Sequence, residues 1–206
     1  MKRIFDLILS IFSFVIFLIP LLLIAILVIL TSEGPALYWS DRVGRGGKIF
    51  KMPKFRSMLK DSPIVATHLL DNPDVYLSPI GGFLRRTSLD ELPQLFSVLK
   101  GDMSFIGPRP ALFNQYNLIA LRNKHGINKL LPGITGWAQV NGRDELSIPD
   151  KVALDEEYLK LQSFWFDIKG PKVQDQLKTV KERDRSYLLF SLDGKETKDQ
   201  DLTENT

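Results

Sequence analysis

An uninterrupted apolar run near the N-terminus constrains this chain more than any other feature. Residues 7–30, LILSIFSFVIFLIPLLLIAILVIL, contain no charged side chain. As a helix the run would extend about 36 Å, enough to cross the apolar core of a bilayer. A cleaved signal peptide is the alternative, but the run is longer than such a segment and no A-x-A type site follows it. The sequence therefore predicts a membrane segment over residues 1–31.

Pro20, near the middle of this run, leaves two topologies open. Its ring and missing N–H interfere with the helical bond to the carbonyl of Ile16, so we expect a kink. A kinked helix can still span the membrane, or it can enter, bend at Pro20 and leave by the same face. Lys2 and Arg3 place the N-terminus in the cytoplasm, so a spanning helix would export everything after residue 31. Hydropathy alone favours the spanning form.

The rest of the chain has the composition of one modest domain. The 206 residues are 44% apolar, which supports a single core. With no cysteine and two isolated histidines, His68 and His125, disulfides are excluded and a zinc site is disfavoured. Residues 191–206 are polar and acidic, which predicts a disordered tail and leaves a basic domain at 32–190. A basic domain suits anionic lipid headgroups, phosphorylated substrates or nucleic acid.

Periodicity and turn residues predict the main elements of the domain. Apolar spacing indicates helices at residues 92–99, 111–131, 151–161 and 173–181. The first is ended by Gly101, and the second has a break near Gly126. Residues 61–80 are rich in turn formers and predict a loop. Asn141-Gly142 indicates a hairpin, with an irregular loop as the alternative.

The segment KIFKMPKFRSM, residues 48–58, alternates basic and apolar side chains. A short strand here would set Lys54 and Arg56 on the same face. Two cations side by side could bind a phosphate. An edge strand protected by solvated lysines is an equally good interpretation of the pattern.

Two adjacent carboxylates, Asp90 and Glu91, begin the segment DELPQLFSVLKG. Ser88 and Glu91 fit a capping box, but Pro93 would then fall inside the helix, where it conflicts with helical bonding. A helix that starts near Asp90 removes this conflict and makes Asp90 its N-cap. The free N–H groups of the helix end would then lower the pKa of Asp90 and keep it ionised.

The surroundings of this pair favour phosphate over sugar-bond chemistry. Neighbouring helix residues point about 100° apart, so the pair cannot face each other across a glycosidic bond. Arg85, Arg86 and Arg109 are close in sequence, and guanidinium groups bind phosphate through paired hydrogen bonds. An ionised aspartate beside a phosphate site can act as a nucleophile toward phosphorus or as a Mg²⁺ ligand. From the residues alone, this chemistry and simple helix capping both remain open.

Several long motifs in order resemble one family. They are KFRSM, LRRTSLDELPQLFSVLKGDMSFIGPRP and PGITGWAQVNGR, and the likeness covers about residues 1–185. They resemble the bacterial sugar transferases, in their small form the monotopic phosphoglycosyl transferases. The resemblance implies transfer of a sugar 1-phosphate from a UDP-sugar to undecaprenyl phosphate, with Mg²⁺, at the start of surface glycan assembly. An N-acetylated hexosamine or deoxy-hexosamine is the sugar that it suggests.

The resemblance also implies roles for particular residues. Asp90 would attack the β-phosphate and expel UMP, the lipid phosphate would attack the resulting phosphosugar-aspartyl enzyme, and Mg²⁺ would contact Asp90. Glu91 would orient groups or assist proton movement. Lys54, Arg56, Arg86 and Arg109 would serve the phosphates. The matched positions on the nucleotide-sugar side are Thr135, Gln139, Asn141 and Arg143. Asp167 matches an acidic position of the family's SF-x-x-D stretch.

For the fold, the resemblance implies an α+β, mostly helical protein with a small sheet or hairpin. Its N-terminal membrane segment would be re-entrant, broken at Pro20, which overturns the spanning form and leaves the site at the cytosolic face of the bacterial inner membrane. Expected partners are the UDP-sugar, undecaprenyl phosphate, membrane lipids and downstream glycosyltransferases, and no nucleic acid. Departures from the family pattern stand at Gly82, Leu131 and Gly170-Pro171.

A rival interpretation of another class is a membrane-tethered module that binds lipid or a protein complex without catalysis. It leaves the Asp90-Glu91 pair and the rigid GPRP segment without a purpose.

Overall fold

The computed structural model describes residues 1–63, 72–142 and 146–169. The chain divides into two compact units, Met1–Phe164 and Trp165–Thr206. The described elements are α1 (Lys2–Thr31), β1 (Leu37–Val43), η1 (Arg45–Gly47), β2 (Ile49–Phe55), η3 (Pro73–Tyr76), α2 (Gly81–Arg86), η4 (Leu89–Gln94), α3 (Leu95–Lys100), β3 (Ser104–Ile106), α4 (Tyr116–Lys124), η5 (Ile127–Lys129), β4 (Gly133–Thr135), α5 (Trp137–Val140), α6 (Ile148–Leu161) and α7 (Phe164–Lys169). The expected class, α+β and mostly helical with a small hairpin, is confirmed. The predicted helix at 173–181, the acidic tail and the departure at Gly170-Pro171 lie outside the described residues.

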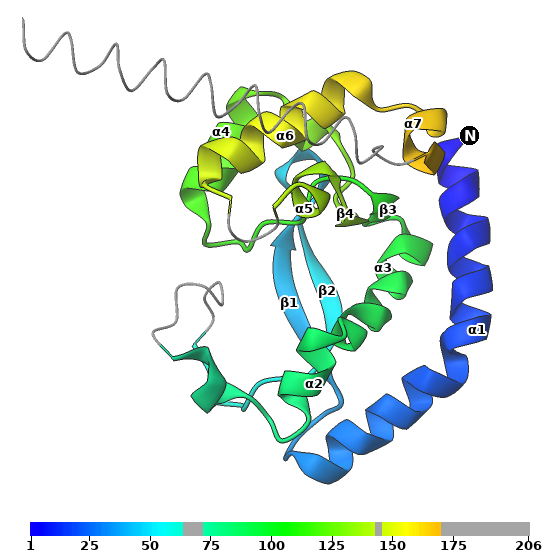
Figure 1. Ribbon diagram of the computed structural model, residues 1–206, viewed down its shortest axis with the longest axis vertical. Helices are drawn as coiled ribbons and strands as arrows, with labels where there is room; N and C mark the ends of the chain where they lie inside the picture. The colour runs from blue at the N-terminus through cyan, green and yellow to red at the C-terminus, as the bar shows by residue number, and fades with distance from the viewer. Residues whose placement is uncertain (64–71, 143–145, 170–206) are drawn as a thin grey trace, which may run out of the picture. The chain divides into compact units, whose positions relative to one another are not determined.

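The long helix α1 continues through Pro20 as one element, and Figure 1 shows it as a bowed helix in blue. In the described part of the chain it alone is long and apolar enough to cross a membrane. Most of its large apolar side chains are exposed, for example Phe12, Val15 and Ile19. Such a surface is stable only against lipid or another apolar partner.

Both ends of α1 contact the rest of the first unit. At the N-terminal end, Arg3 donates to the carbonyls of Val98 and Leu99, the last turn of α3, at 2.6 and 2.8 Å. Carbonyls at a helix end have no partner within the helix, so a guanidinium group there stabilises α3. At the other end, Ile24 and Val28 are buried in a core cluster with Phe55 and Leu84.

The hairpin of β1 and β2 is antiparallel and pairs Tyr38 with Lys54 and Arg42 with Phe50. The register therefore puts Arg42 and Lys54 on one face of the hairpin, since paired residues share a face and faces alternate along a strand. Phe50 and Met52 pack with Val98 and Met103 in a second core cluster. This packing joins the hairpin to α3 and so to the segment that precedes α3.

A short parallel pair, β3 and β4, brings two loops together. Gly107 follows β3, and Gly136 follows β4. A side chain at Gly136 would come within 2.1 Å of the Gly107 carbonyl oxygen, so only glycine allows this approach. The hairpin predicted at Asn141-Gly142 is wrong: β4 pairs with β3, the chain then forms α5, and Asn141 ends that helix by donating to the Trp137 carbonyl at 2.8 Å.

The helix that follows the carboxylate pair does not begin at Asp90. Residues 89–94 form the 3₁₀ turn η4, which leads directly into α3. No side-chain cap bond is made at Ser88, whose φ of 57° places it in the left-handed region. The predicted N-cap role of Asp90 and the capping box are therefore both wrong. The end of α3 at Gly101, with φ of 97°, and the helix α6 are as predicted.

Candidate active site

Ser88, which directly precedes η4 and its two carboxylates, has a strained backbone conformation. Among the described residues it is the one non-glycine residue with a positive φ. Such backbone strain gathers at functional sites, where the surroundings hold it in place. Ser88 lies between α2 and η4, and both carboxylates of η4 are largely shielded from solvent: Asp90 is 7% exposed and the Glu91 side chain 18%.

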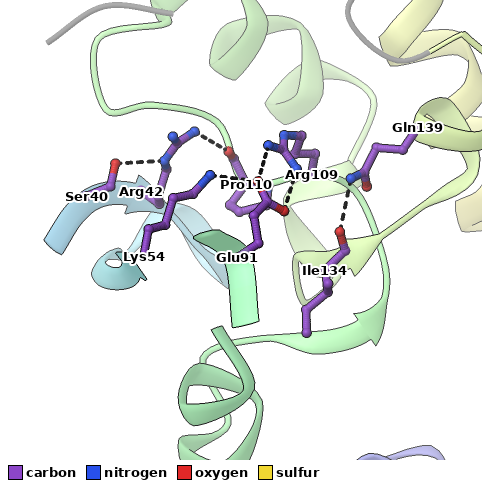
Figure 2. A network of polar contacts seen from close by, with 8 residues as sticks. All are labelled: Ser40, Arg42, Lys54, Glu91, Arg109, Pro110, Ile134 and Gln139. Atoms are coloured by element: carbon purple, nitrogen blue, oxygen red, sulfur yellow. Dashed lines mark hydrogen bonds and ion pairs between the residues drawn. The ribbon is translucent and has the colours of Figure 1, made fainter. Parts of the chain in front are cut away.

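Glu91 is held by two cations from distant parts of the chain (Figure 2). Lys54 Nζ donates to Glu91 Oε1 at 2.7 Å, and Arg109 Nη2 donates to the same oxygen at 2.7 Å. Burial alone would raise the pKa of Glu91, but the charges of Lys54 and Arg109 and their hydrogen bonds lower it to about 2. Glu91 is therefore a permanent anion that organises the cations around it.

Asp90 has the opposite electrostatics. Burial raises the pKa of Asp90, and the charge of Glu91 acts in the same direction, against the lowering effect of Lys54 and Arg85. The sequence-based prediction of a lowered pKa is wrong, because it assumed a helix end that Asp90 does not cap. A desolvated carboxylate is a better nucleophile than a hydrated one, since less water must be removed before it attacks.

Arg42 belongs to this site and was not predicted from the sequence. It donates to Ser40 Oγ at 3.0 Å and to the Pro110 carbonyl at 3.1 Å (Figure 2). Burial and the charge of Arg109 lower the pKa of Arg42 to about 10, and the charge of Glu91 opposes this. A prediction of the hairpin register would have identified Arg42, because that register puts Arg42 and Lys54 on the same face.

Two of the predicted phosphate residues lie differently from Lys54 and Arg109. Arg56 donates to the carbonyls of Ser32 and Gly34, at 2.8 and 3.1 Å, and so anchors the end of α1. Arg86 is exposed at the end of α2, whereas its neighbour Arg85 is the one whose charge acts on Asp90. The phosphate roles of Arg56 and Arg86 remain predictions.

The second loop of the β3–β4 pair carries other predicted residues. Thr135 is exposed at the end of β4. Gln139 donates to the Ile134 carbonyl at 3.0 Å (Figure 2), while its Oε1 is buried without a hydrogen-bond partner in the described residues. Such an acceptor is suited to a donor from a ligand. Arg143 lies outside the described residues, and Asp167 lies in α7, in the second unit.

A divalent cation fits this site in one way. No group of three or more metal-ligating side chains occurs in the described residues, so a cage made by protein alone is absent there. Mg²⁺ in phosphate chemistry is commonly held by one or two carboxylates together with phosphate oxygens. Asp90 can supply such a carboxylate, whereas both oxygens of Glu91 already accept hydrogen bonds.

Taken together, four cationic side chains act on two carboxylates at this site: Arg42, Lys54, Arg85 and Arg109. The excess of positive charge favours a multiply charged anion such as a diphosphate. Fold and site thus define a protein with one long apolar helix and a buried carboxylate among cations that suit a phosphate group.

The chain belongs to the bacterial sugar transferase family, whose model matches residues 1–173. It is 42% identical over 180 residues to the undecaprenyl-phosphate glucose phosphotransferase of Komagataeibacter xylinus, covering 82% of this chain and 34% of the relative. It is 39% identical to the undecaprenyl-phosphate galactose phosphotransferase of Salmonella typhimurium, with 82% and 38% covered. An uncharacterized sugar transferase, EpsL of Bacillus subtilis, is 38% identical, and 82% of both chains is covered. The chain thus spans about a third of the length of the first two relatives.

Proposed function

We propose that this protein transfers a sugar 1-phosphate from a UDP-sugar to undecaprenyl phosphate and releases UMP. The proposal is supported by the family and by the names of the relatives, which include undecaprenyl-phosphate phosphotransferases. The observation that carries it is a buried aspartate, Asp90, beside cations that Glu91 holds in place. This combination supplies both a nucleophile and a diphosphate site.

The proposed reaction has two displacements at one phosphorus atom. A carboxylate oxygen of Asp90 attacks the β-phosphorus, the bond from that phosphorus to the oxygen of UMP breaks, and UMP leaves with the electron pair. An oxygen of undecaprenyl phosphate then attacks the same phosphorus and displaces Asp90, which recovers its carboxylate. Arg109 and Lys54 stabilise the negative charge that builds up on the phosphoryl oxygens. The Arg109 side chain, 41% exposed, can reach substrate while it stays paired with Glu91.

A bound Mg²⁺ would neutralise the diphosphate charge, with Asp90 as its carboxylate ligand on the protein. In this proposal Glu91 keeps Lys54 and Arg109 in place and takes no part in bond formation, since its own pKa is lowered to about 2. The role assigned to Glu91 is thus narrower than the proton-moving role implied by the family resemblance.

We further propose that α1 is re-entrant and does not span the membrane. Its N-terminal end contacts α3 through Arg3, and its C-terminal end is buried with Phe55 and Leu84. Both contacts are with one folded unit, which lies on one side of a membrane. UDP-sugars are cytosolic, so in this proposal the unit lies at the cytosolic face of the inner membrane. Downstream glycosyltransferases that extend the lipid-linked sugar are the expected functional partners.

The covalent step can be tested without the lipid acceptor. Purified protein is incubated with UDP-sugar labelled at the β-phosphate, from a panel of UDP-glucose, UDP-galactose and N-acetylated or deoxygenated hexosamines. We expect label on the wild-type chain with one of these, and none on Asp90→Asn. Glu156→Gln, which alters an exposed ion pair, is the matched control and should label normally. UMP release by Asp90→Asn at the wild-type rate would contradict the proposal.

The topology has its own test, which the absence of cysteine simplifies. Glu33→Cys places one reactive thiol at an exposed position just after α1. In inside-out and right-side-out vesicles, we expect labelling by a membrane-impermeant reagent only from the cytosolic face. Labelling from the opposite face would restore the spanning helix.

A further inference from the structure

The segment that carries Arg109 is held mainly by its carbonyl groups. Pro108 and Pro110 have no N–H to donate, so carbonyls are the chief hydrogen-bonding groups of the main chain here. Each carbonyl of residues 108–111 accepts a bond from outside the segment, and the donors come from β1, α4 and β4. The four donors, in order, are Gly133 N at 3.0 Å, Arg122 Nη1 at 2.8 Å, Arg42 Nη1 at 3.1 Å and Val43 N at 2.9 Å.

The bond to the carbonyl of Arg109 comes from a buried ion pair. Arg122, on α4, also donates to Asp155 Oδ2 through Nε at 2.9 Å and through Nη2 at 2.6 Å. The two side chains are 12% and 1% exposed. The guanidinium group is planar and rigid, so Asp155 sets the direction in which Nη1 of Arg122 points. That direction is toward the Arg109 main chain.

Helix packing alone is a weak explanation for this pair. A buried ion pair can often be replaced by apolar residues without loss of stability. Arg122 is on α4 and Asp155 is on α6. A second ion pair already joins the end of α4 to α6, between His125 and Glu156, whose side chains are 37% and 28% exposed. The third bond of Arg122, into the candidate active site, is what the His125–Glu156 pair does not make.

We propose that Arg122 and Asp155 are positioning residues: the pair holds the Arg109 main chain so that the Arg109 guanidinium meets Glu91 and substrate phosphate. The expected effect on catalysis rests on the proposed function, whereas the positioning of the Arg109 main chain does not. Neither residue touches the reacting atoms, and both act through Arg109.

The first experiment needs no activity. Hydrogen exchange is measured in the peptide spanning residues 104–116 for wild type, Arg122→Lys and the double variant Arg122→Met/Asp155→Leu. The double variant removes both charges, so it avoids a stranded buried ion, and Arg122→Lys keeps a charge beside Asp155. We expect about 10-fold faster exchange in the double variant, since a hydrogen bond to a charged donor is lost. Glu156→Gln should exchange like wild type.

The second experiment measures kcat/KM for UMP release in the same variants. Displacement of Arg109 should cost the double variant about 10- to 100-fold. In an Arg109→Gln background the same two substitutions should cost less than about twofold, because the group they position is gone. A structural role would lower activity equally in both backgrounds.

Exchange at wild-type rates in both Arg122 variants would overturn the inference, and so would penalties that add fully to that of Arg109→Gln. A wild-type protein without UMP release would refute the proposed function instead. In that case hydrogen exchange alone decides whether the pair positions Arg109.

Discussion

Glu91 is a half-buried and Asp155 a fully buried carboxylate, and both are paired with arginine, yet their pKa values shift in opposite directions. Glu91 accepts bonds from Lys54 and Arg109, and its pKa is lowered to about 2. Asp155 forms an ion pair with Arg122, and burial raises its pKa against the lowering effects of Arg122 and Lys151. Two cations are therefore bonded to the one carboxylate of Glu91, whereas one arginine is bonded to the one carboxylate of Asp155. An excess of positive charge suits an anionic ligand, whereas a one-to-one buried ion pair suits a group that holds other parts of the protein in place.

The largest effect on stability should come from the Arg122–Asp155 pair. Arg122→Met leaves Asp155 buried without its cation, which costs about 3–5 kcal/mol of unfolding free energy. Chemical unfolding in detergent measures it. Addition of Asp155→Leu should recover most of the loss, because the stranded charge is removed with its partner. An unchanged unfolding free energy in Arg122→Met would show that buried Asp155 does not depend on Arg122.

Arg109→Gln should lower activity strongly and leave stability unchanged. We expect kcat/KM to fall about 10²- to 10³-fold, the usual cost of removing one group that stabilises transition-state charge. Stability should not fall, because the substitution lowers repulsion among the remaining cations. Unfolding and UMP release measured on one preparation test both parts. A large loss of stability would mean that Arg109 belongs to the fold more than to the site.

Arg42→Gln should have a smaller effect. Glutamine can still donate to Ser40 or Pro110, so the hairpin keeps its contacts while one charge is lost. We expect KM for the UDP-sugar to rise about 10-fold, as for a lost hydrogen bond to a charged group. Lys51→Gln, which removes an exposed cation from the same hairpin, is the control and should leave KM unchanged. If Arg42→Gln and Lys51→Gln raised KM equally, Arg42 would act only through the overall charge of the surface.

Lys54→Met should shift the pH dependence. In the proposed reaction Asp90 acts in its ionised form, so activity should be present above the pKa of Asp90 and should be lost as pH falls through it. Lys54 lowers that pKa against the effect of burial. Its removal should raise the pKa of Asp90 and move the acid limb of kcat/KM to higher pH. A shift to lower pH would exclude Asp90 as the group that titrates.

Much of the fold follows from local patterns. The apolar run predicts α1, the alternation at residues 48–58 predicts β2, and Gly101 correctly marks the end of α3. The errors arose where a local pattern competed with tertiary pairing. Asn141-Gly142 suggests a hairpin, but β4 gains more from pairing with β3, and Asn141 becomes the end of α5.

The sequence by itself determined the apolar membrane segment, the adjacency of Asp90 and Glu91, and the motifs that mark the family. Only the tertiary structure decided which cations meet which carboxylate, that Arg42 joins the site, and that Arg56 turns away to Ser32. It also decided the opposite pKa shifts of Asp90 and Glu91. The physical reason is that burial and charge pairing depend on groups far apart in the chain, and neighbouring residues carry no information about them.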